Sequence, residues 1–257
     1  MTGKFVWYEL MTTDASGAER FYRDVVGWGA RDAGMSAFKY TLLTVGEIAV
    51  AGLMQFPPET PQAQERPAWL GYVSVADVDA KAAEAQKLGA KMCHAPTDIP
   101  NVGRFAVLSD PQGAVFALFK PNGDMPQAEP MTRGTTGWHE LHAADAETAF
   151  AFYNALFGWK KMQTMDLGPL GSYHIFGDEG APMGFGGMFN DPMSVQPHWL
   201  YYFAVADIDA AVGRVVGAGG KVNHGPQEVP GGAWIIQGVD PQGAAFALVG
   251  SRNAGAA

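Results

Sequence analysis

Two glutamates follow a tryptophan at the same short spacing in distant parts of the chain, as Trp7-x-Glu9 and Trp138-x-Glu140. Strand alternation would place each Glu on the same face as its Trp. Burial beside aromatic rings raises the pKa of a carboxyl group and makes it a usable acid or base. His142 would share the face of Glu140, close enough to exchange a proton or a hydrogen bond. We therefore expect Glu9, Glu140 and His142 to be the acid–base residues.

Other interpretations of these groups stay open. The two glutamates could satisfy backbone or arginine donors, with Arg104 as one such donor. His142, His174 and His198 could in principle assemble a metal site. Their spacing matches no helix or hairpin geometry that would bring them together, so the sequence does not favour that site.

Aromatic residues are frequent in the strand-like segments, and most must belong to the core. Those on a pocket face would suit a flat or hydrophobic small molecule, with a few polar groups to orient it. The side chains expected to contact such a ligand are Trp7, Trp138, Tyr72, Tyr202, Arg104, Trp234 and His174.

The elements that position these residues occur twice. Residues 21–28, FYRDVVGW, return as FYNALFGW at 152–159, and the turn DPQG at 110–113 returns at 240–243. VADVDA at 75–80 likewise matches VADIDA at 205–210. The chain is therefore a tandem duplication, which predicts two equivalent sites or one site between the copies.

Each copy contains a smaller repeat of strand, helix and three strands. In the first copy we expect strands over 5–11, 39–45 and 48–54, with a helix from Asp14 to Gly27, and then a second unit over 69–119. The second copy repeats this, with a strand over 183–189 among its elements. A segment rich in Pro and Gly at 121–136 predicts a linker between domains at 1–120 and 137–250.

Composition narrows the classes of partner. The formal charge is −9 and the 17 Lys and Arg residues are scattered, which speaks against nucleic acid. The sequence predicts no membrane span and no signal peptide, so cytoplasmic residence is the expectation. Cys93 is the one cysteine, which leaves no intramolecular disulfide. We expect a small-molecule ligand, and a monomer with an internal pseudo-twofold or a weak homodimer.

Taken together, the paired units, the FY…GW helix, the VADVDA helix start and the DPQG hairpin resemble the vicinal oxygen chelate superfamily. This group includes glyoxalase I, extradiol dioxygenases and bleomycin resistance proteins. The resemblance covers both copies and implies an α+β fold, in which four βαβββ units form two cupped mixed sheets.

The resemblance also implies where a divalent metal would be bound, on four strands that line each cup. The matching positions are Trp7, Gly52, Leu70 and Ala117 in the first copy, and Trp138, Gly187, Leu200 and Ala247 in the second. None of these side chains is a metal ligand. The expectation is that the usual metal site, and any other cofactor, is absent.

These observations favour a glyoxalase-like protein that binds a small apolar or aromatic molecule without metal. One alternative is a lyase or isomerase in which Glu140 and His142 act as acid and base. Another is a metal-dependent glyoxalase or dioxygenase with displaced ligands. His142, His174 and His198 have no histidine counterparts in the first copy, which favours the second copy for any chemistry.

Overall fold

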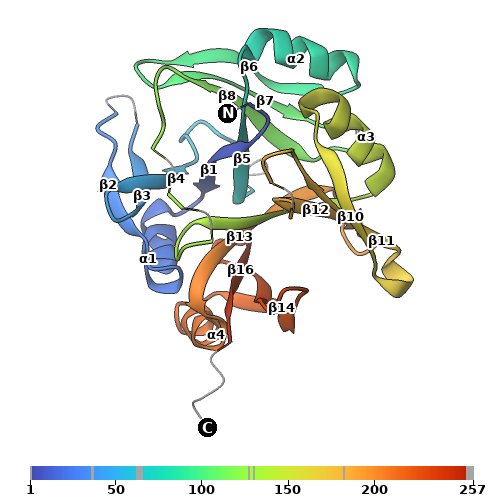
Figure 1. Ribbon diagram of the computed structural model, residues 1–257. Helices are drawn as coiled ribbons and strands as arrows, with labels where there is room; N and C mark the ends of the chain where they lie inside the picture. Colours follow the sequence, from blue (N-terminus) through green and yellow to red (C-terminus); the bar gives the residue numbers. More distant parts are fainter. Residues whose placement is uncertain are drawn as a thin grey trace. The chain divides into compact units, whose positions relative to one another are not determined.

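The computed structural model describes residues 2–35, 38–61, 66–126, 128–129, 131–181 and 183–252 (Figure 1). Within them, the strand–helix–strand–strand–strand unit occurs four times. The elements of the first copy are β1 (Phe5–Thr12), α1 (Ala15–Val25), β2 (Gly29–Asp32), β3 (Tyr40–Val45), β4 (Ile48–Gln55), β5 (Ala68–Ser74), α2 (Val78–Lys87), β6 (Lys91–Ile99), β7 (Gly103–Ser109) and β8 (Val115–Pro121).

The second copy repeats this order, with a 3-10 turn added before its third strand. Its elements are β9 (Thr136–Ala143), α3 (Ala146–Phe157), β10 (Lys160–Asp166), η2 (Gly168–Leu170), β11 (Ser172–Gly177), β12 (Gly186–Asn190), β13 (His198–Asp207), α4 (Ile208–Gly217), β14 (Lys221–Glu228), β15 (Trp234–Val239) and β16 (Ala245–Ser251).

Each helix begins at an aspartate whose side chain accepts a hydrogen bond from the backbone N–H three residues later, which satisfies one donor of the first turn. These caps are Asp14, Asp77, Asp145 and Asp207. After α1, Gly27 adopts a φ of 91°, as expected for the residue that ends a helix.

The strands form two mixed eight-stranded sheets, in the orders β2-β3-β4-β1-β5-β8-β7-β6 and β10-β11-β12-β9-β13-β16-β15-β14. The first strand of a unit pairs in parallel with its last strand, as β9 does with β12, and the hairpin strands pair antiparallel. The expected α+β fold with two mixed sheets is confirmed. In Figure 1, α2 lies along β6 to β8, and α4 along β14 to β16.

The structure corrects some expected element boundaries. β12 begins at Gly186 rather than at residue 183, because Gly184 turns the chain with a φ of 80°. The outer strands β2, β6, β10 and β14 had no predicted range, since their mostly exposed residues lack apolar alternation. His94 and His224 lie within the outer strands β6 and β14.

By contacts, the chain divides into two compact units that each combine parts of both copies. The first compact unit comprises residues 1–7, 70–125 and 138–200, and the second compact unit comprises residues 8–69, 126–137 and 201–257. Each unit therefore takes one helical repeat from the first copy and one from the second. No helix within the described residues has the length and apolar character needed to span a bilayer.

The repeated phrases meet inside each unit in a buried chain of hydrogen bonds. In the second unit, Trp69 Nε1 donates to the Tyr22 hydroxyl (2.8 Å), which donates to Asp240 (3.1 Å). Asp240 also accepts the N–H groups of its own turn, from Gln242 and Ala244 (both 2.9 Å). We call this arrangement the Trp–Tyr–Asp chain. It joins the helix of one copy to the DPQG turn of the other.

The first unit contains the same arrangement. Trp199 Nε1 donates to Tyr153 (3.0 Å), and Tyr153 donates to Asp110 (3.1 Å). The tyrosines are fully buried and the aspartates are 2% exposed. Burial raises the pKa of both aspartates, although their hydrogen bonds oppose this shift. The FY…GW and DPQG motifs are thus joined by one hydrogen bond, from the tyrosine to the aspartate, which explains why both motifs occur in each copy.

Removal of the tyrosine hydroxyl should destabilise the fold, because Trp69 and Asp240 would each lose a buried partner. We expect Tyr22→Phe to lower the free energy of unfolding by about 1–3 kcal/mol, and Tyr153→Phe by a similar amount. Urea denaturation measures this loss. Tyr40→Phe is the control, since that hydroxyl also donates to a carboxylate but is only half-buried. Equal losses of unfolding free energy in all three variants would contradict a special role for the Trp–Tyr–Asp chain.

Candidate functional site

The second copy carries a connected line of polar side chains on one face of β9. Trp138 Nε1 donates to the Tyr173 hydroxyl (2.8 Å), and that hydroxyl donates to Glu140 Oε2 (2.8 Å). Gly187 of β12 pairs in register with Glu140. A side chain at Gly187 would run into the ring of Tyr173. Glycine at this position therefore lets the tyrosine reach the carboxylate.

The line continues from Glu140 to the end of β9. Glu140 Oε1 lies 3.1 Å from His142 Nε2, and His142 Nδ1 lies 2.8 Å from Asp191 Oδ2, just beyond β12. Glu140 and His142 are 7% and 6% exposed. The structure thus brings together two of the expected acid–base residues and adds a second carboxylate. We call Tyr173, Glu140, His142 and Asp191 the polar line.

His198, the first residue of β13, covers the imidazole of His142. The two rings stack with centroids 4.6 Å apart and an interplanar angle of 17°. His198 Nδ1 lies 3.2 Å from Ser194 Oγ and 3.1 Å from the carbonyl of Gln196. The loop between β12 and β13 therefore contacts His142 of the polar line at both of its ends, through Asp191 and through His198.

The electrostatics of the line favour a cationic His142 between two carboxylates. Burial opposes the charge on His142, but hydrogen bonds and charges of Glu140 and Asp191 outweigh it and raise the pKa of the imidazole. Burial likewise opposes charge on Asp191, yet His142 and the Met193 N–H keep the pKa of this carboxyl below its usual value. Burial and the nearby Glu140 charge raise the pKa of Tyr173 well above 10, so its hydroxyl remains a donor.

His198 differs from His142 because burial, and then the charge of His142, lower the pKa of its ring. Of the two stacked rings, His142 therefore holds a proton more readily than His198 does. Two like charges at this ring separation would repel each other.

The first copy has counterparts of Tyr173 and Glu140, the inner half of this arrangement. It lacks counterparts of His142 and Asp191, the outer half. Tyr40 donates to Glu9 Oε2 (2.7 Å), and Gly52, in register with Glu9, leaves room for the tyrosine ring. The outer positions are apolar. His142, Asp191 and His198 of the second copy correspond to Met11, Phe56 and Ala68.

Sequence reasoning missed Tyr173 and Asp191. The signal that could have found them is the comparison of the two copies. Phe56 and Asp191 both follow a strand directly, and their N–H groups bond the carbonyls of Thr12 and Ala143. An apolar pair in one copy, Met11 and Phe56, is thus an ionisable pair in the other.

The remaining ligand-contact candidates do not join the polar line. Trp7 packs with Leu70 and Phe105 against Tyr72 in an apolar cluster of the first unit. In the second unit, Tyr202 accepts a hydrogen bond from Gln237 (2.7 Å).

Two further candidates for ligand contact, Arg104 and Trp234, interact with other side chains. Arg104 makes two hydrogen bonds to Asp79 of α2 (2.6 and 2.8 Å) and one to Asp98 (3.0 Å). Trp234 lies beneath the guanidinium of Arg252, 4.3 Å from its ring centroid.

Two other histidines of the second copy point to the opposite face of the sheet. His174 contacts Glu147 of α3 (2.9 Å) and Thr164 (3.2 Å). His139 stacks on Phe5 with centroids 4.3 Å apart and contacts the carbonyl of Phe185 (2.6 Å). Burial lowers the pKa of His139 to about 4, so it is a neutral core residue.

The family metal can be tested against the side chains present. The expected ligand positions carry Trp, Gly, Leu and Ala in both copies, and none of these offers a donor atom. At Gly52 and Gly187 the adjacent space holds a tyrosine ring. Among the residues that the structure describes, no three His, Cys, Asp or Glu side chains are grouped to hold a metal ion. The donor set does not fit the group.

Comparison with known proteins places this geometry in a family. The sequence profile of the Glyoxalase/Bleomycin resistance protein/Dioxygenase superfamily matches residues 4–118 and 136–248. The chain belongs to this superfamily. CFP32 of Mycobacterium tuberculosis (strain CDC 1551 / Oshkosh), named as a candidate glyoxylase, is 32% identical over 95% of this chain and 93% of its own length. The anthracycline biosynthesis protein DauV of Streptomyces sp. (strain C5) is 32% identical over 98% of this chain and 94% of its own.

Solved structures of the superfamily share the fold. The Mn(II)-bound glyoxalase from Novosphingobium aromaticivorans matches with a TM-score of 0.66 and 16% identity, over 97% of this chain and 82% of its own. The 2,3-dioxygenase LapB from Pseudomonas sp. KL28 matches with a TM-score of 0.67 and 13% identity, over 98% of this chain and 94% of its own. At these identities the likeness shows the fold alone.

The His142–Asp191 pair should make stability depend on pH in a defined direction. Because folding raises the pKa of His142, its contribution is complete below the unfolded pKa of about 6.5 and is lost as pH rises through the folded value. Denaturation from pH 6 to pH 9 should therefore show a decline that disappears in His142→Gln. NMR titration should show a lower His142 pKa in Asp191→Asn. An unchanged pKa in that variant would contradict the assignment.

Proposed function

We propose that this protein binds a small organic molecule through the second copy, without a metal ion. The observation that carries the proposal is the hydrogen-bonded series from Trp138 through Tyr173 to Glu140. In this series the tyrosine ring occupies the space beside Gly187, one of the positions where the resemblance to the superfamily would imply a metal ligand. A buried carboxylate next to half-buried aromatic rings can orient a ligand that is otherwise held by apolar contact.

The aromatic side chains support a flat, largely apolar ligand. Trp138 and Tyr173 are half-buried, so their rings are partly accessible. Two curated relatives are named as anthracycline biosynthesis proteins, which supports a polycyclic aromatic compound of that kind. The polar line would then form hydrogen bonds with hydroxyl or carbonyl groups on the edge of the ring system.

Ligand binding can be measured with the intact chain treated with a chelator. We expect an anthracycline, or another polycyclic phenol in a panel, to quench tryptophan fluorescence and raise the melting temperature. Glu140→Gln should weaken binding by about tenfold, equivalent to one charged hydrogen bond. Glu9→Gln is the matched control in the first copy and should change affinity little. Binding that appears only after a divalent metal is restored would overturn the metal-free proposal.

A second candidate function is acid–base catalysis by a lyase or isomerase. The specific observation in its favour is the buried contact between Glu140 and His142, with Asp191 holding the other side of the imidazole. Glu140 could remove a proton from a bound carbon acid and return it at another atom. The cationic His142 would stabilise the negative charge that develops nearby.

Proton exchange separates catalysis from binding alone. If Glu140 acts as a base, the wild-type protein should exchange an acidic C–H of a bound ligand with deuterium from solvent, as seen by NMR. Glu140→Gln should slow this exchange at least about a hundredfold, within the range of general-base contributions. The Glu9→Gln variant should exchange at the wild-type rate. Equal exchange in wild type and Glu140→Gln would exclude Glu140 as the base, while ligand binding could persist.

A further inference from the structure

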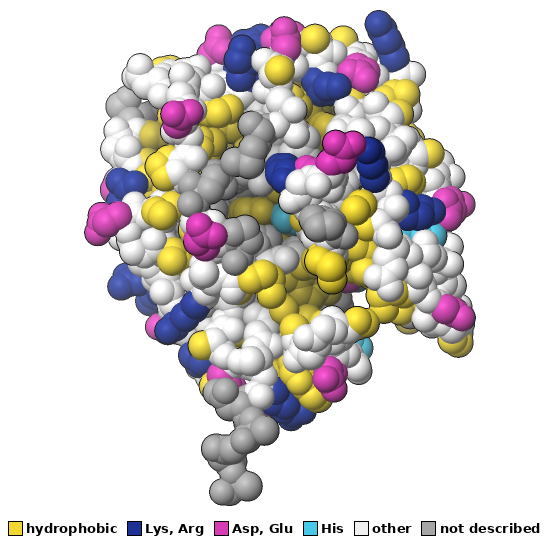
Figure 2. Space-filling model, viewed as in Figure 1, with side chains coloured by type: hydrophobic (Ala, Val, Ile, Leu, Met, Phe, Trp, Pro, Cys, Tyr) yellow, Lys and Arg dark blue, Asp and Glu magenta, His cyan; other side chains and the backbone are white. Residues whose placement is uncertain are grey.

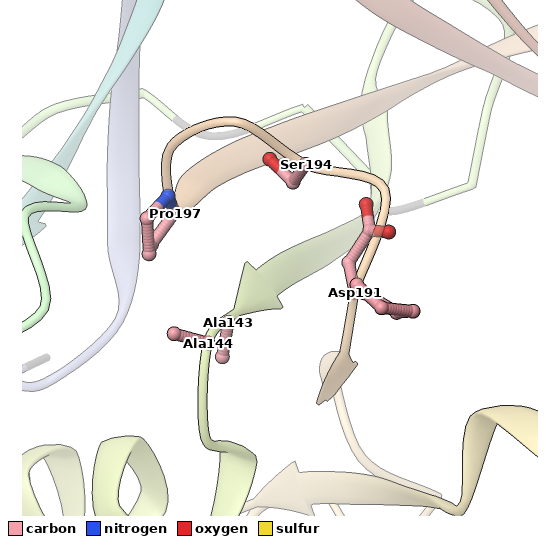
Figure 3. Close-up of a pocket in the computed structure, with 6 residues that line it drawn as sticks. Ala143, Ala144, Asp191, Ser194 and Pro197 are labelled. Atoms are coloured by element: carbon pink, nitrogen blue, oxygen red, sulfur yellow. The ribbon is translucent and has the colours of Figure 1, made fainter.

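The loop that joins β12 to β13 leads into His198, the first residue of β13. Figure 3 shows this loop arching over the end of β9, with Ser194 near its crest and Asp191 and Pro197 on its two sides. These three residues help to line a pocket of about 250 Å³ beneath the loop. His198 therefore lies where the loop returns to the sheet, directly after a residue of the pocket wall.

The loop determines which nitrogen of His198 carries the proton. Nδ1 of His198 lies 3.1 Å from the carbonyl oxygen of Gln196, and a carbonyl oxygen can only accept a hydrogen bond. Nδ1 also lies 3.2 Å from Ser194 Oγ, whose own hydrogen is donated to the same carbonyl (2.7 Å). The contact with the carbonyl thus requires the proton on Nδ1. In a neutral imidazole the other nitrogen, Nε2, is then an acceptor with a free lone pair.

This lone pair is available to a ligand. Nε2 of His198 makes no hydrogen bond within the described part of the chain, since both contacts of the ring nitrogens involve Nδ1. The side chain is half-buried, so the ring is not closed off from a ligand. Burial is the main cause that holds the pKa of His198 below its ordinary value of 6.5, so the ring is neutral at pH 7.5.

The stacking with His142 indicates the side on which Nε2 lies. In both rings Nδ1 contacts the β12–β13 loop, at Asp191 for His142 (2.8 Å) and at Gln196 for His198. The rings are nearly parallel, with an interplanar angle of 17°. Because the two nitrogens of an imidazole lie on different edges, both Nε2 atoms are directed away from the loop. On that side His142 Nε2 lies 3.1 Å from Glu140 Oε1, and the charge of Glu140 also acts on His198.

A ligand group beside Nε2 of His198 must be a hydrogen-bond donor. The lone pair can accept the hydrogen of a hydroxyl group, whereas a carbonyl, an ether or a carboxylate would bring two acceptors together. A hydroxyl group is also neutral, so it leaves the charges of Glu140, His142 and Asp191 as they are. On a flat apolar ligand, this donor is a hydroxyl group carried by the aromatic ring.

We propose that His198 is a specificity-determining residue of the second copy, whose Nε2 accepts a hydrogen bond from an aromatic hydroxyl group of the ligand. The inference rests on the proposed function, because it requires an aromatic ligand at Trp138, Tyr173 and Glu140. The loop keeps Nδ1 protonated and thereby keeps Nε2 free for this bond. The first copy has Ala68 at the start of β5, so it lacks this acceptor.

Two ligands that differ by one methyl group test the role of the hydroxyl. 2-Naphthol and 2-methoxynaphthalene have the same ring system and an oxygen at the same position, but the ether has no hydrogen to donate. We expect the intact chain at pH 7.5 to bind 2-naphthol about tenfold more tightly, equivalent to one hydrogen bond. NMR titration of the labelled protein gives both dissociation constants. Binding of the ether reports on the proposed function by itself.

Two substitutions separate ligand recognition from support of the loop. In His198→Asn the side-chain NH2 group can replace the Nδ1–H donor to Gln196, but no acceptor remains at Nε2. The preference for the naphthol should therefore disappear while the ether binds as before. In His198→Gln the longer amide can place its oxygen at the position of Nε2 and should restore the preference. His94→Asn is the matched control, since His94 is also stacked on a ring, that of Phe105, and should change neither affinity.

The tautomer can be tested without a ligand. The nitrogen shifts of His198 at pH 7.5 should show a protonated Nδ1 and an unprotonated Nε2, and the Nε2 signal should move when 2-naphthol is added. A protonated Nε2 in the free protein would overturn the proposal, as would a naphthol preference that survives in His198→Asn. If the ether binds as tightly as the naphthol, this inference alone is wrong. If neither ligand binds, the proposed function is wrong as well.

Discussion

The structure depends on a buried hydrogen-bond chain that joins one copy of the repeat to the other. In each unit a tryptophan donates to a tyrosine, and the tyrosine donates to the aspartate of a DPQG turn. Asp240 and Asp110 can be buried because every bond that they accept comes from their own turn or from this tyrosine. Helix and turn are thereby fixed to each other.

The two copies share this scaffold and differ at the ends of two paired strands, which are β1 and β4 in the first copy and β9 and β12 in the second. Glu9 and Glu140 both accept a tyrosine hydroxyl over a glycine, so this inner pair is common to the copies. Beyond it, Met11 and Phe56 are apolar, whereas His142 and Asp191 are bonded to each other. On the face drawn in Figure 2, positive and negative side chains are interspersed rather than gathered by sign. Beyond the shared glutamate, the second copy therefore carries an ionisable pair that the first copy lacks.

Much of the fold could be predicted from sequence, because its signals are local. The aspartate caps, the strand alternation of β1 and β9, and the duplicated phrases each depend on a few neighbouring residues. The polar outer strands β6 and β14 could not be predicted in this way, since they are held by pairing and not by an apolar face. The contact of Glu140 with His142 follows from alternation on one strand. Tyr173 lies on β11 and Asp191 directly follows β12, and only the pairing of β11, β12 and β9 brings them there.

The first copy also shows what the scaffold requires. Met11 and Phe56 occupy the positions of His142 and Asp191, so apolar side chains are compatible with the same strand pairing at these positions. Burying ions costs several kcal/mol of desolvation each, and a well-packed apolar pair in their place is often as stable or more so. The fold itself therefore gives no reason for the ionic pair. The pair instead adjoins a pocket and the stacked ring of His198, which is consistent with the ligand-binding role that we propose for the second copy.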